Sequence, residues 1–411
     1  MTTGTFPSSG LSYAVLRSGS AVGHCALTIK CGTRCEEGFH SGIAHFTEHT
    51  IFRGTARRSA TVINGYLDRL GGELNAYTTK EEIVIHATVL KEDLPKAVRL
   101  LFELATEATF PETEIQTERG VVIDEIISSK DVPAEDIYDR FEDMLFEGHP
   151  LGNPILGTAA SVRKISSEEL VRFRDRFFVP GRMVLSVVAD IPEEKMVKEI
   201  GRLDRRLFSA AAPALEETQP RREPPQPRLF DKSIEKRHHE VNAVIGGPAP
   251  SLYGGKDRIA AVFLANILGG PASNSLLNAE LRERHGWVYG VECSYTQYAD
   301  TGVIAISFGC DRPNLEKCMR SIGRILSGVA ETPLSSRRTA SFRKQIIGQM
   351  AIASASGEAQ CLSMGKSMSA FGKVLSSEET RALLEEVTAE DLRAAAEKLF
   401  RPSAISRLVY L

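Results

Sequence analysis

The strongest constraint on the fold is a repeat between the two halves of the chain. The segment SSEELVRFRDRFFVPGRMVLSVV ends the first half, and TAEDLRAAAEKLFRPSAISRLVYL ends the second. Three pairs of positions match at one constant offset of 222 residues: Leu170 with Leu392, Phe178 with Phe400, and Pro180 with Pro402. Each segment opens with Ser or Thr and acidic residues, continues with helical spacing, stops at Pro and ends in a β-rich run. The chain is therefore predicted to contain a duplicated domain.

A proline-rich stretch separates the two copies. Residues 207–228 include five prolines, a run of alanines and charges of both signs, which break every periodic pattern. A chain of 411 residues also exceeds what one hydrophobic core usually serves. We expect a first domain over residues 1–206, a linker over 207–228 and a second domain over 229–411.

Strand and helix patterns are mixed within the first half. GHCALTIKCG (23–32) and EEIVIHATVL (81–90) alternate like half-buried strands. Helical spacing lies between them, over Ile43–Arg53 and over Ala60–Leu70, the second closed by Gly71, and two more helices are expected over about 91–108 and 112–129. This order predicts an α+β fold, in which each domain is a mostly antiparallel sheet packed with helices.

Composition excludes several classes of function. Lys and Arg number 50 against 53 Asp and Glu, so the formal charge is −3, and no basic stripe indicates nucleic acid or an anionic membrane. No segment reads as a leader peptide or a membrane span. The seven cysteines follow no disulfide spacing, and Cys31 and Cys35 lack the second pair that a four-cysteine zinc site needs. We expect a cytoplasmic protein with reduced thiols and neither nucleic-acid nor membrane partners.

Two histidines at helical spacing mark the candidate active site. In SGIAHFTEHTIFRGT, His45 and His49 lie one turn apart on one face of a helix, so both imidazoles can bind one ion. Glu48 lies on the same side but is offset from the two ligand positions. It suits a base that activates water at the metal better than it suits a third ligand. Lone histidines such as His24, His86 and His149 have no partner at this spacing and are expected to be ordinary residues.

A helix further along the chain supplies the carboxylate that a catalytic zinc site still needs. In TERGVVIDEIIS, Glu118 and Glu125 are two turns apart and face the same way. Glu125 then completes a site with His45 and His49 for one Zn²⁺ per chain. Glu118, further along that face, would orient a ligand from behind. Two imidazoles and one carboxylate leave such a site about +1, which favours hydroxide near neutral pH, and Glu48 would pass the water proton to the leaving amine.

With these residues the chain resembles the pitrilysin/insulinase family of zinc peptidases, whose motif reverses the commoner His-Glu-x-x-His order. The likeness runs nearly end to end and includes NAYTTKE (75–81), HPLGNPILGT (149–158) and LRERHGWVYG (281–290). The resemblance implies that His45, His49 and Glu125 are the zinc ligands, Glu48 the general base and Glu118 a second functional carboxylate.

The resemblance also implies where a substrate binds. Asn75 and Ala76 match the strand edge to which family members add a peptide as an extra strand. Arg282 and Tyr289 match a pair in the second domain that binds substrate carbonyl groups and helps to stabilise the tetrahedral intermediate. A fixed guanidinium and a phenol hydroxyl are suitable donors to a developing oxyanion on chemical grounds as well.

Chain length determines the expected assembly. The family includes chains with four such domains and half-length chains that pair, and this chain has half length. We therefore expect half of a clamshell chamber, a homodimer with a shared active site, and zinc-dependent hydrolysis of unfolded peptides or small polypeptides. Two alternatives stay open: a structural or assembly relative without catalysis, and a catalytic subunit that works only with a different partner chain.

Overall fold

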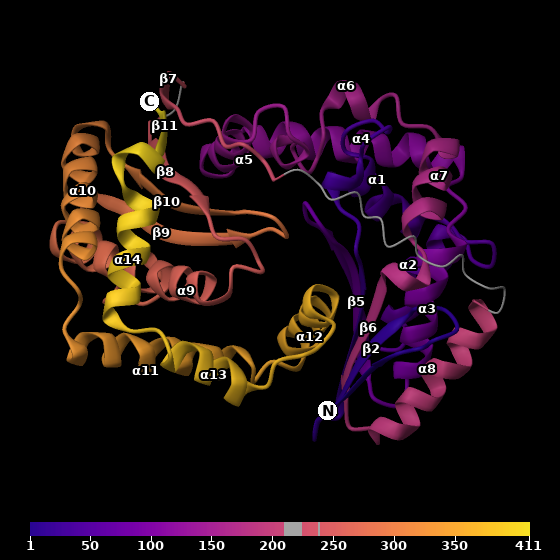
Figure 1. The fold of residues 1–411 in the computed structure, drawn as a ribbon. Helices are drawn as coiled ribbons and strands as arrows, with labels where there is room; N and C mark the ends of the chain where they lie inside the picture. Colours follow the sequence, from indigo (N-terminus) through magenta and orange to yellow (C-terminus); the bar gives the residue numbers. More distant parts are fainter. Residues whose placement is uncertain (209–223, 237–238) are drawn as a thin grey trace. The chain divides into compact units, whose positions relative to one another are not determined.

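The computed structural model describes residues 1–208, 224–236 and 239–411, which form two compact units (Figure 1). The first unit comprises Met1–Ser128, the described part of Asn153–Arg221, and Ile352–Leu375. The second comprises Ser129–Gly152, the described part of Arg222–Ala351, and Ser376–Leu411. Each unit therefore includes one segment from the opposite half of the sequence.

The first unit contains a six-stranded sheet in the order β1-β2-β6-β3-β5-β4. Its strands are β1 (Thr2–Thr5), β2 (Ser12–Arg17), β3 (Val22–Ile29), β4 (Glu73–Thr78), β5 (Ile83–Leu90) and β6 (Met183–Ala189). Strands β2 and β6 are parallel, and the other neighbours are antiparallel. Strand β4 therefore lies at one edge of the sheet.

The second unit contains a five-stranded sheet in the order β7-β11-β8-β10-β9. Its strands are β7 (Asp231–Ile234), β8 (Val241–Ala249), β9 (Val288–Gln297), β10 (Gly302–Cys310) and β11 (Ser406–Tyr410). Only β7 and β11 are parallel among these pairs.

The two sheets have the same topology. Apart from the additional edge strand β1, each runs first, fifth, second, fourth, third in chain order, with its one parallel pair between the first and fifth strands. The predicted α+β class and the predicted duplication are confirmed. The repeat found around Leu170 and Leu392 corresponds to the helix and strand that close each copy, namely α7 (Ser167–Phe177) with β6, and α14 (Ala389–Phe400) with β11.

One face of each sheet packs against helices from its own half of the chain. In the first unit these include α3 (Leu94–Glu107), which contacts β3 and β5, and α8 (Glu193–Leu207), which contacts β2. In the second unit they include α9 (Gly255–Gly269) and α14, while α10 (Leu315–Glu331) packs on α14. The strands alternate, so their inward residues form a large apolar core on this face of each sheet.

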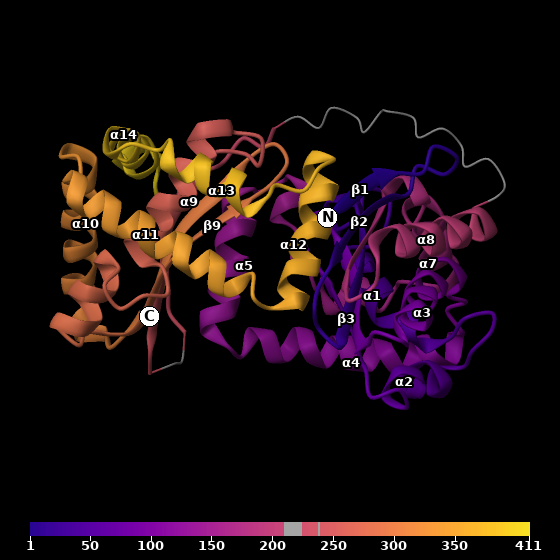
Figure 2. The ribbon, with the colours of Figure 1, turned by 90° about the horizontal axis from the view of Figure 1, so that it is seen from below.

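The opposite face of each sheet is covered by a helix from the other half of the chain. Helix α12 (Gly357–Phe371) lies on β2, β3 and β6 of the first sheet, where Cys361 and Met364 complete a small core. Helix α5 (Pro133–Leu145) lies on β8 and β11 of the second sheet, where Ile137 and Phe141 do the same. The two halves have thus exchanged helices, as the colours of α5 and α12 show in Figures 1 and 2.

The remaining helices connect these layers or carry the site. They are α1 (Ile43–Thr50), α2 (Ala60–Asp68), α4 (Glu112–Lys130), α6 (Ala159–Val162), α11 (Ser336–Ala353) and α13 (Ser377–Glu385). The expected boundaries at 206 and 229 stay a prediction, because residues 209–223 of the expected linker lie outside the described residues. The exchange of helices is a feature that the linear boundaries do not contain.

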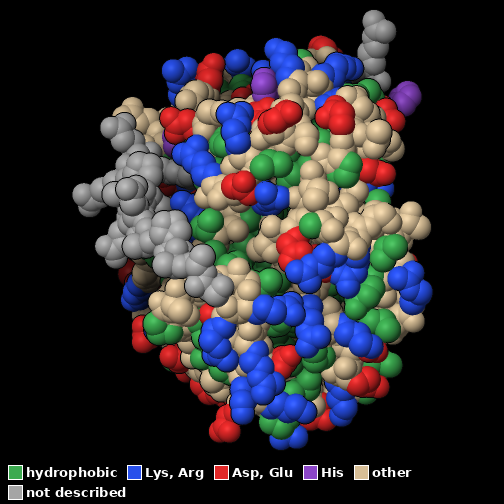
Figure 3. Space-filling model, turned by 90° about the vertical axis from the view of Figure 1, so that its right-hand side faces the viewer, with side chains coloured by type: hydrophobic (Ala, Val, Ile, Leu, Met, Phe, Trp, Pro, Cys, Tyr) green, Lys and Arg blue, Asp and Glu red, His purple; other side chains and the backbone are tan. Residues whose placement is uncertain are grey.

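Figure 3 shows a face of the molecule with charged side chains of both signs. Lys and Arg side chains are densest in the lower half of this view, with Asp and Glu side chains among them. Helix α8 contributes exposed Lys195, Lys198 and Arg202, and Arg202 pairs with Glu199. Among the described residues, no helix combines the length and the apolar character needed to cross a membrane.

Candidate metal centre

Helix α1 carries both histidines. Its first residues are held by the side chain of Glu36, which lies six residues before Gly42. Gly42 precedes the helix with φ of +90°, a conformation that favours glycine. The buried side chain of Glu36 accepts hydrogen bonds from the backbone N–H groups of Gly42 and Ala44, each at 3.0 Å. These groups have no partner within a helix, so Glu36 satisfies donors that would otherwise be buried without one.

The end of α1 is shorter than predicted. The α-helix stops at Thr50, and a 3₁₀ turn, η2 (Ile51–Arg53), replaces its expected last turn. The hydroxyls of Thr47 and Thr50 donate to carbonyl groups one turn back, which bends helices, and Gly54 at φ of +150° ends the turn.

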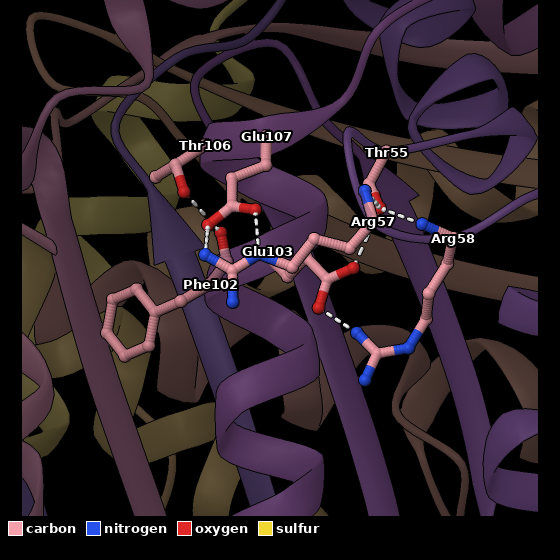
Figure 4. A network of polar contacts seen from close by, with 7 residues as sticks. All are labelled: Thr55, Arg57, Arg58, Phe102, Glu103, Thr106 and Glu107. Atoms are coloured by element: carbon pink, nitrogen blue, oxygen red, sulfur yellow. Dashed lines mark hydrogen bonds and ion pairs between the residues drawn. The ribbon is translucent and has the colours of Figure 1, made fainter.

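A polar network then attaches the following loop to helix α3 (Figure 4). Buried Glu103 accepts hydrogen bonds from Thr55, at 2.7 Å, and from Arg58. Arg57 makes a two-pronged contact with Glu107, at 2.6 and 2.9 Å. The segments on both sides of α1 are therefore held by acidic side chains that are buried or make bidentate contacts.

The three predicted ligands converge. His45, His49 and Glu125 each offer an atom within 4.8 Å of the others. Glu125 Oε2 lies 3.7 Å from His45 Nε2 and 3.4 Å from His49 Nε2. Ligands about 2.0–2.1 Å from one tetrahedral zinc ion are about 3.3 Å apart, so this spacing is close to what zinc requires.

The charges around the two imidazoles also suit a cation. Burial and the neighbouring charge of His49 lower the pKa of His45 to about 3, so His45 is neutral and can donate a lone pair. Burial lowers the pKa of His49, but the three surrounding carboxylates outweigh burial and raise it above the usual value. His45 is therefore a ready lone-pair donor, and the carboxylates that favour a proton on His49 would favour Zn²⁺ in its place. Imidazole nitrogen and carboxylate oxygen are ligands that Zn²⁺ prefers.

Glu118 lies beside His49, at the ring nitrogen that does not face Glu125. Its side chain is only 1 % exposed, and Oε2 lies 3.7 Å from His49 Nδ1, on the side of the ring away from Glu125. Oε1 accepts a hydrogen bond from Arg53. Burial raises the pKa of Glu118, but His49 and Arg53 outweigh it and lower the pKa below the usual value. The carboxylate is thus placed to orient the His49 ring.

Glu48 lies beside this group and contacts the end of strand β4. Thr78 Oγ1 donates a hydrogen bond of 2.9 Å to Glu48 Oε2. Burial raises the pKa of Glu48 above the usual value, and the hydrogen bond from Thr78 acts in the opposite direction. A carboxylate whose pKa is raised toward neutrality is better suited to accept and return a proton.

Asn75 and Ala76 lie where the sequence predicted, in edge strand β4. They pair with His86 and Ile85 of β5, and β4 has no second neighbour in the described sheet. Helix α1 contacts the same strand. A strand edge that can accept an extended peptide therefore lies beside the helix that carries Glu48.

Arg282 and Tyr289 belong to the second unit. Arg282 lies in a π-helical turn, η5 (Asn278–Arg284), and lines a cavity of about 590 Å³ beside α9 and β9. Tyr289 is the second residue of β9, is 61 % exposed and donates a hydrogen bond to Asp311. Both side chains are exposed on adjoining elements, while the three predicted ligands, Glu48 and Glu118 belong to the first unit.

Three residues near the site were missed by the sequence analysis. Arg53 follows His49 by one helical turn, and Thr78 belongs to the quoted segment NAYTTKE, so both lie in segments that the sequence had singled out, but their partners lie on other elements. Glu36 gives no signal in the sequence. The three histidines expected to be ordinary residues have these contacts: His24 with Thr88, His86 with Glu358, and His149 with the backbone of Leu151.

Two protein-family models match this chain, and one of them covers the candidate metal centre. Residues 14–159 match the family model "Insulinase (Peptidase family M16)", and this range contains the HxxEH motif, Glu118 and Glu125. Residues 164–345 match the model "Peptidase M16 inactive domain", which contains Arg282 and Tyr289.

Relatives cover most of the chain. A Mycobacterium tuberculosis protein named an uncharacterized zinc protease is 30% identical over 369 residues, which are 90% of this chain and 83% of that protein. A Rickettsia felis protein with the same description is 29% identical over 93% of this chain and 91% of its own length. Among solved structures, a protease from Helicobacter pylori has a TM-score of 0.89 at 19% identity and covers 100% of this chain and 98% of its own. A Pseudomonas fluorescens structure titled as a peptidase M16 inactive domain gives the same score and identity over 100% and 97%.

Proposed function

This chain belongs to the insulinase family of peptidases, family M16, and on that basis we propose that it is a zinc-dependent metalloendopeptidase that hydrolyses unfolded peptides or small polypeptides. The observation that carries the proposal is the convergence of His45, His49 and Glu125 within 4.8 Å. The relatives named zinc proteases support it.

His45, His49 and Glu125 would hold the zinc ion. When bound, Zn²⁺ supplies a Lewis acid that polarises the scissile carbonyl group and acidifies water. Glu118 fixes the orientation of the His49 ring through Nδ1, and Arg53 holds Glu118 in turn.

The protein's own acid–base chemistry rests on Glu48. One of its oxygens, Oε2, is held by Thr78, which leaves Oε1 to take the proton of the attacking water. Glu48 then gives that proton to the leaving amine, so the carboxylate returns to its starting state. Its raised pKa makes Glu48 a stronger base and so favours the first transfer.

Peptide binding is assigned to the free edge of β4 and to the second unit. A substrate would add an extended strand beside Asn75 and Ala76, so main-chain hydrogen bonds would hold it largely independently of sequence. Arg282 and Tyr289 would donate to substrate carbonyl oxygens and to the oxyanion of the tetrahedral intermediate.

We extend the proposal to a homodimer in a clamshell arrangement. Each site would combine the metal centre of one subunit with Arg282 and Tyr289 of the partner subunit, related by a two-fold axis. The half length of the chain within its family supports this arrangement. We also propose that the enzyme acts in the cytoplasm and that it has no nucleic-acid or membrane partners; the formal charge of −3 supports the second point.

Zinc analysis and peptide digestion test the proposed function. Purified protein should contain one zinc per chain and cleave members of a peptide library, whereas a structural relative should contain none. Removing the metal with a chelator should abolish cleavage, and zinc should restore it. Glu48→Gln should keep its zinc and lose at least about 10²-fold in kcat, because an amide cannot accept the proton. Zinc-loaded protein that cleaves only after a different chain is added would favour a subunit with an unlike partner.

A further inference from the structure

Strand β4 joins two parts of the proposed site that the sequence analysis treats separately. Its residues Asn75 and Ala76 lie along the free edge, and its last residue is Thr78. The hydroxyl of Thr78 donates to Glu48 Oε2 at 2.9 Å. The strand that would bind the peptide therefore also contacts the proposed base.

The direction of the Thr78 side chain is set by the sheet. Successive residues of a strand point to opposite faces, so Thr78 shares a face with Ala76, which packs against the core that includes α1. Backbone pairing of Thr78 with Ile83 fixes the position of the Thr78 backbone. The donor is therefore attached to a rigid element, whereas the acceptor is at the end of a flexible side chain.

A glutamate needs such an anchor. Glu48 has three side-chain torsions, and the last is broad, so the carboxylate of an unanchored Glu48 would sample many orientations. Within the described part of the chain, Thr78 is the side chain that donates a hydrogen bond to it. Catalytic groups must be held within about 0.5 Å of their productive position.

We propose that Thr78 is a positioning residue that orients Glu48, so that the strand edge that receives the peptide also fixes the base. The proposal rests on the proposed peptidase function. Anchoring Oε2 directs Oε1 to a constant place relative to the β4 edge and to any peptide paired with it. Misplacement of a catalytic group by about 1 Å can cost on the order of 10²-fold in rate.

Replacement of the hydroxyl tests this. Thr78→Val should lower kcat by about 10- to 100-fold with KM changed less than about twofold, because the hydroxyl holds the base and not the peptide. Thr78→Ser, which keeps a hydroxyl, should retain most of the activity. Zinc content and affinity should be those of the wild type in both variants. Thr3→Val, at an exposed position of edge strand β1 in the same sheet, is the matched control and should change neither constant.

Three results would overturn the proposal: kcat of Thr78→Val within about threefold of wild type, equal losses in the Val and Ser variants, or loss of zinc from Thr78→Val. If the valine variant does not fold, Thr78→Ala removes the same hydroxyl and takes the place of the valine variant in the series.

Crystal structures of zinc-loaded wild type and Thr78→Val separate this proposal from the proposed function. Wild-type protein without peptidase activity would refute the proposed function. Even then, a Glu48 carboxylate that moves only when the Thr78 hydroxyl is removed would support the proposal that Thr78 anchors Glu48. An unmoved carboxylate would refute the anchoring.

Discussion

Arg53 donates a hydrogen bond to the carboxylate of Glu118. The donor comes from the turn that follows the two histidines, and the acceptor lies in helix α4, 1 % exposed, beside His49. A buried carboxylate beside a proposed ligand histidine is thus held by a cation from the same segment as that histidine.

Arg53→Met should weaken zinc binding by roughly 10- to 100-fold, the usual cost of removing a group that orients a metal ligand. Without the guanidinium, Glu118 loses a charge-assisted hydrogen bond and no longer holds the His49 ring. Competition with a chelator measures the affinity. Arg53→Lys, which keeps the charge, is the control and should lose less. Equal affinities in the wild type and the Met variant would show that Arg53 only stabilises the fold.

Glu125→Gln should release zinc far more readily than Glu118→Gln. Glu125 Oε2 lies within 3.7 Å of Nε2 of both histidines, whereas Glu118 faces Nδ1 of His49. Titration with the same chelator ranks the two variants, which remove the same charge from the same helix. The opposite order would mean that Glu118 is the ligand.

Mixed dimers test the shared site. Glu48→Gln chains and Arg282→Ala/Tyr289→Phe chains, each inactive alone, should recover about a quarter of wild-type activity when co-expressed with different tags. Random pairing makes half of the dimers mixed, and each mixed dimer regains one of its two sites. Purified mixed dimers as inactive as their parents would place the Arg/Tyr pair and the metal centre in one chain, and an active Arg282→Ala/Tyr289→Phe parent would exclude the pair from catalysis.

Gly157→Ala should destabilise the first unit and reduce zinc affinity. Gly157 has φ of +70°, and a Cβ there would lie 2.5 Å from the carbonyl oxygen of Ser41 and 2.7 Å from Cα of Gly42, where helix α1 begins. Gly38→Ala is the matched control, because Gly38 also has a positive φ, +84°, but open space around it. The control should lose about 1 kcal/mol or somewhat more from backbone strain alone. Thermal unfolding and zinc titration of both variants decide this, and equal losses would contradict the clash.

Stability should fall with rising pH through Glu36. Burial raises the pKa of Glu36 to about 8, well above that of an unfolded chain. Between about pH 4.5 and 8 the folded protein then holds a proton that the unfolded chain has lost, so the free energy of unfolding decreases as pH rises across this window. The slope can reach ~1.4 kcal/mol per pH unit. Glu36→Gln should remove this contribution, so the difference in Tm between variant and wild type should change between pH 5.5 and 8. A constant difference would show that the two N–H donors keep Glu36 ionised throughout.

The sequence predicted local features of the fold well and missed the long-range ones. The repeat around Leu170 and Leu392 predicted the duplication, because capping residues and apolar periodicity mark a helix and the strand after it within a short segment of sequence. The exchange of α5 and α12 had no such signal, since an amphipathic helix does not specify which sheet its apolar face will cover. The spacing of His45 and His49 predicted their convergence, but Glu125 needed the resemblance or the fold to bring it to them. Arg53 and Thr78 escaped because their importance depends on which side chains they meet across elements.

The exchanged helices also affect the order in which the chain can fold during synthesis. The strands of the first sheet have all been synthesised once β6 is made, but α12, which covers their second face, is made far later. Until then Ala26, Val84 and Val188 present apolar surface to water, and such surface on an incomplete domain promotes aggregation. The nascent amino-terminal half should therefore depend on chaperones until translation is almost complete, and a fragment ending near residue 206 should be insoluble when expressed alone.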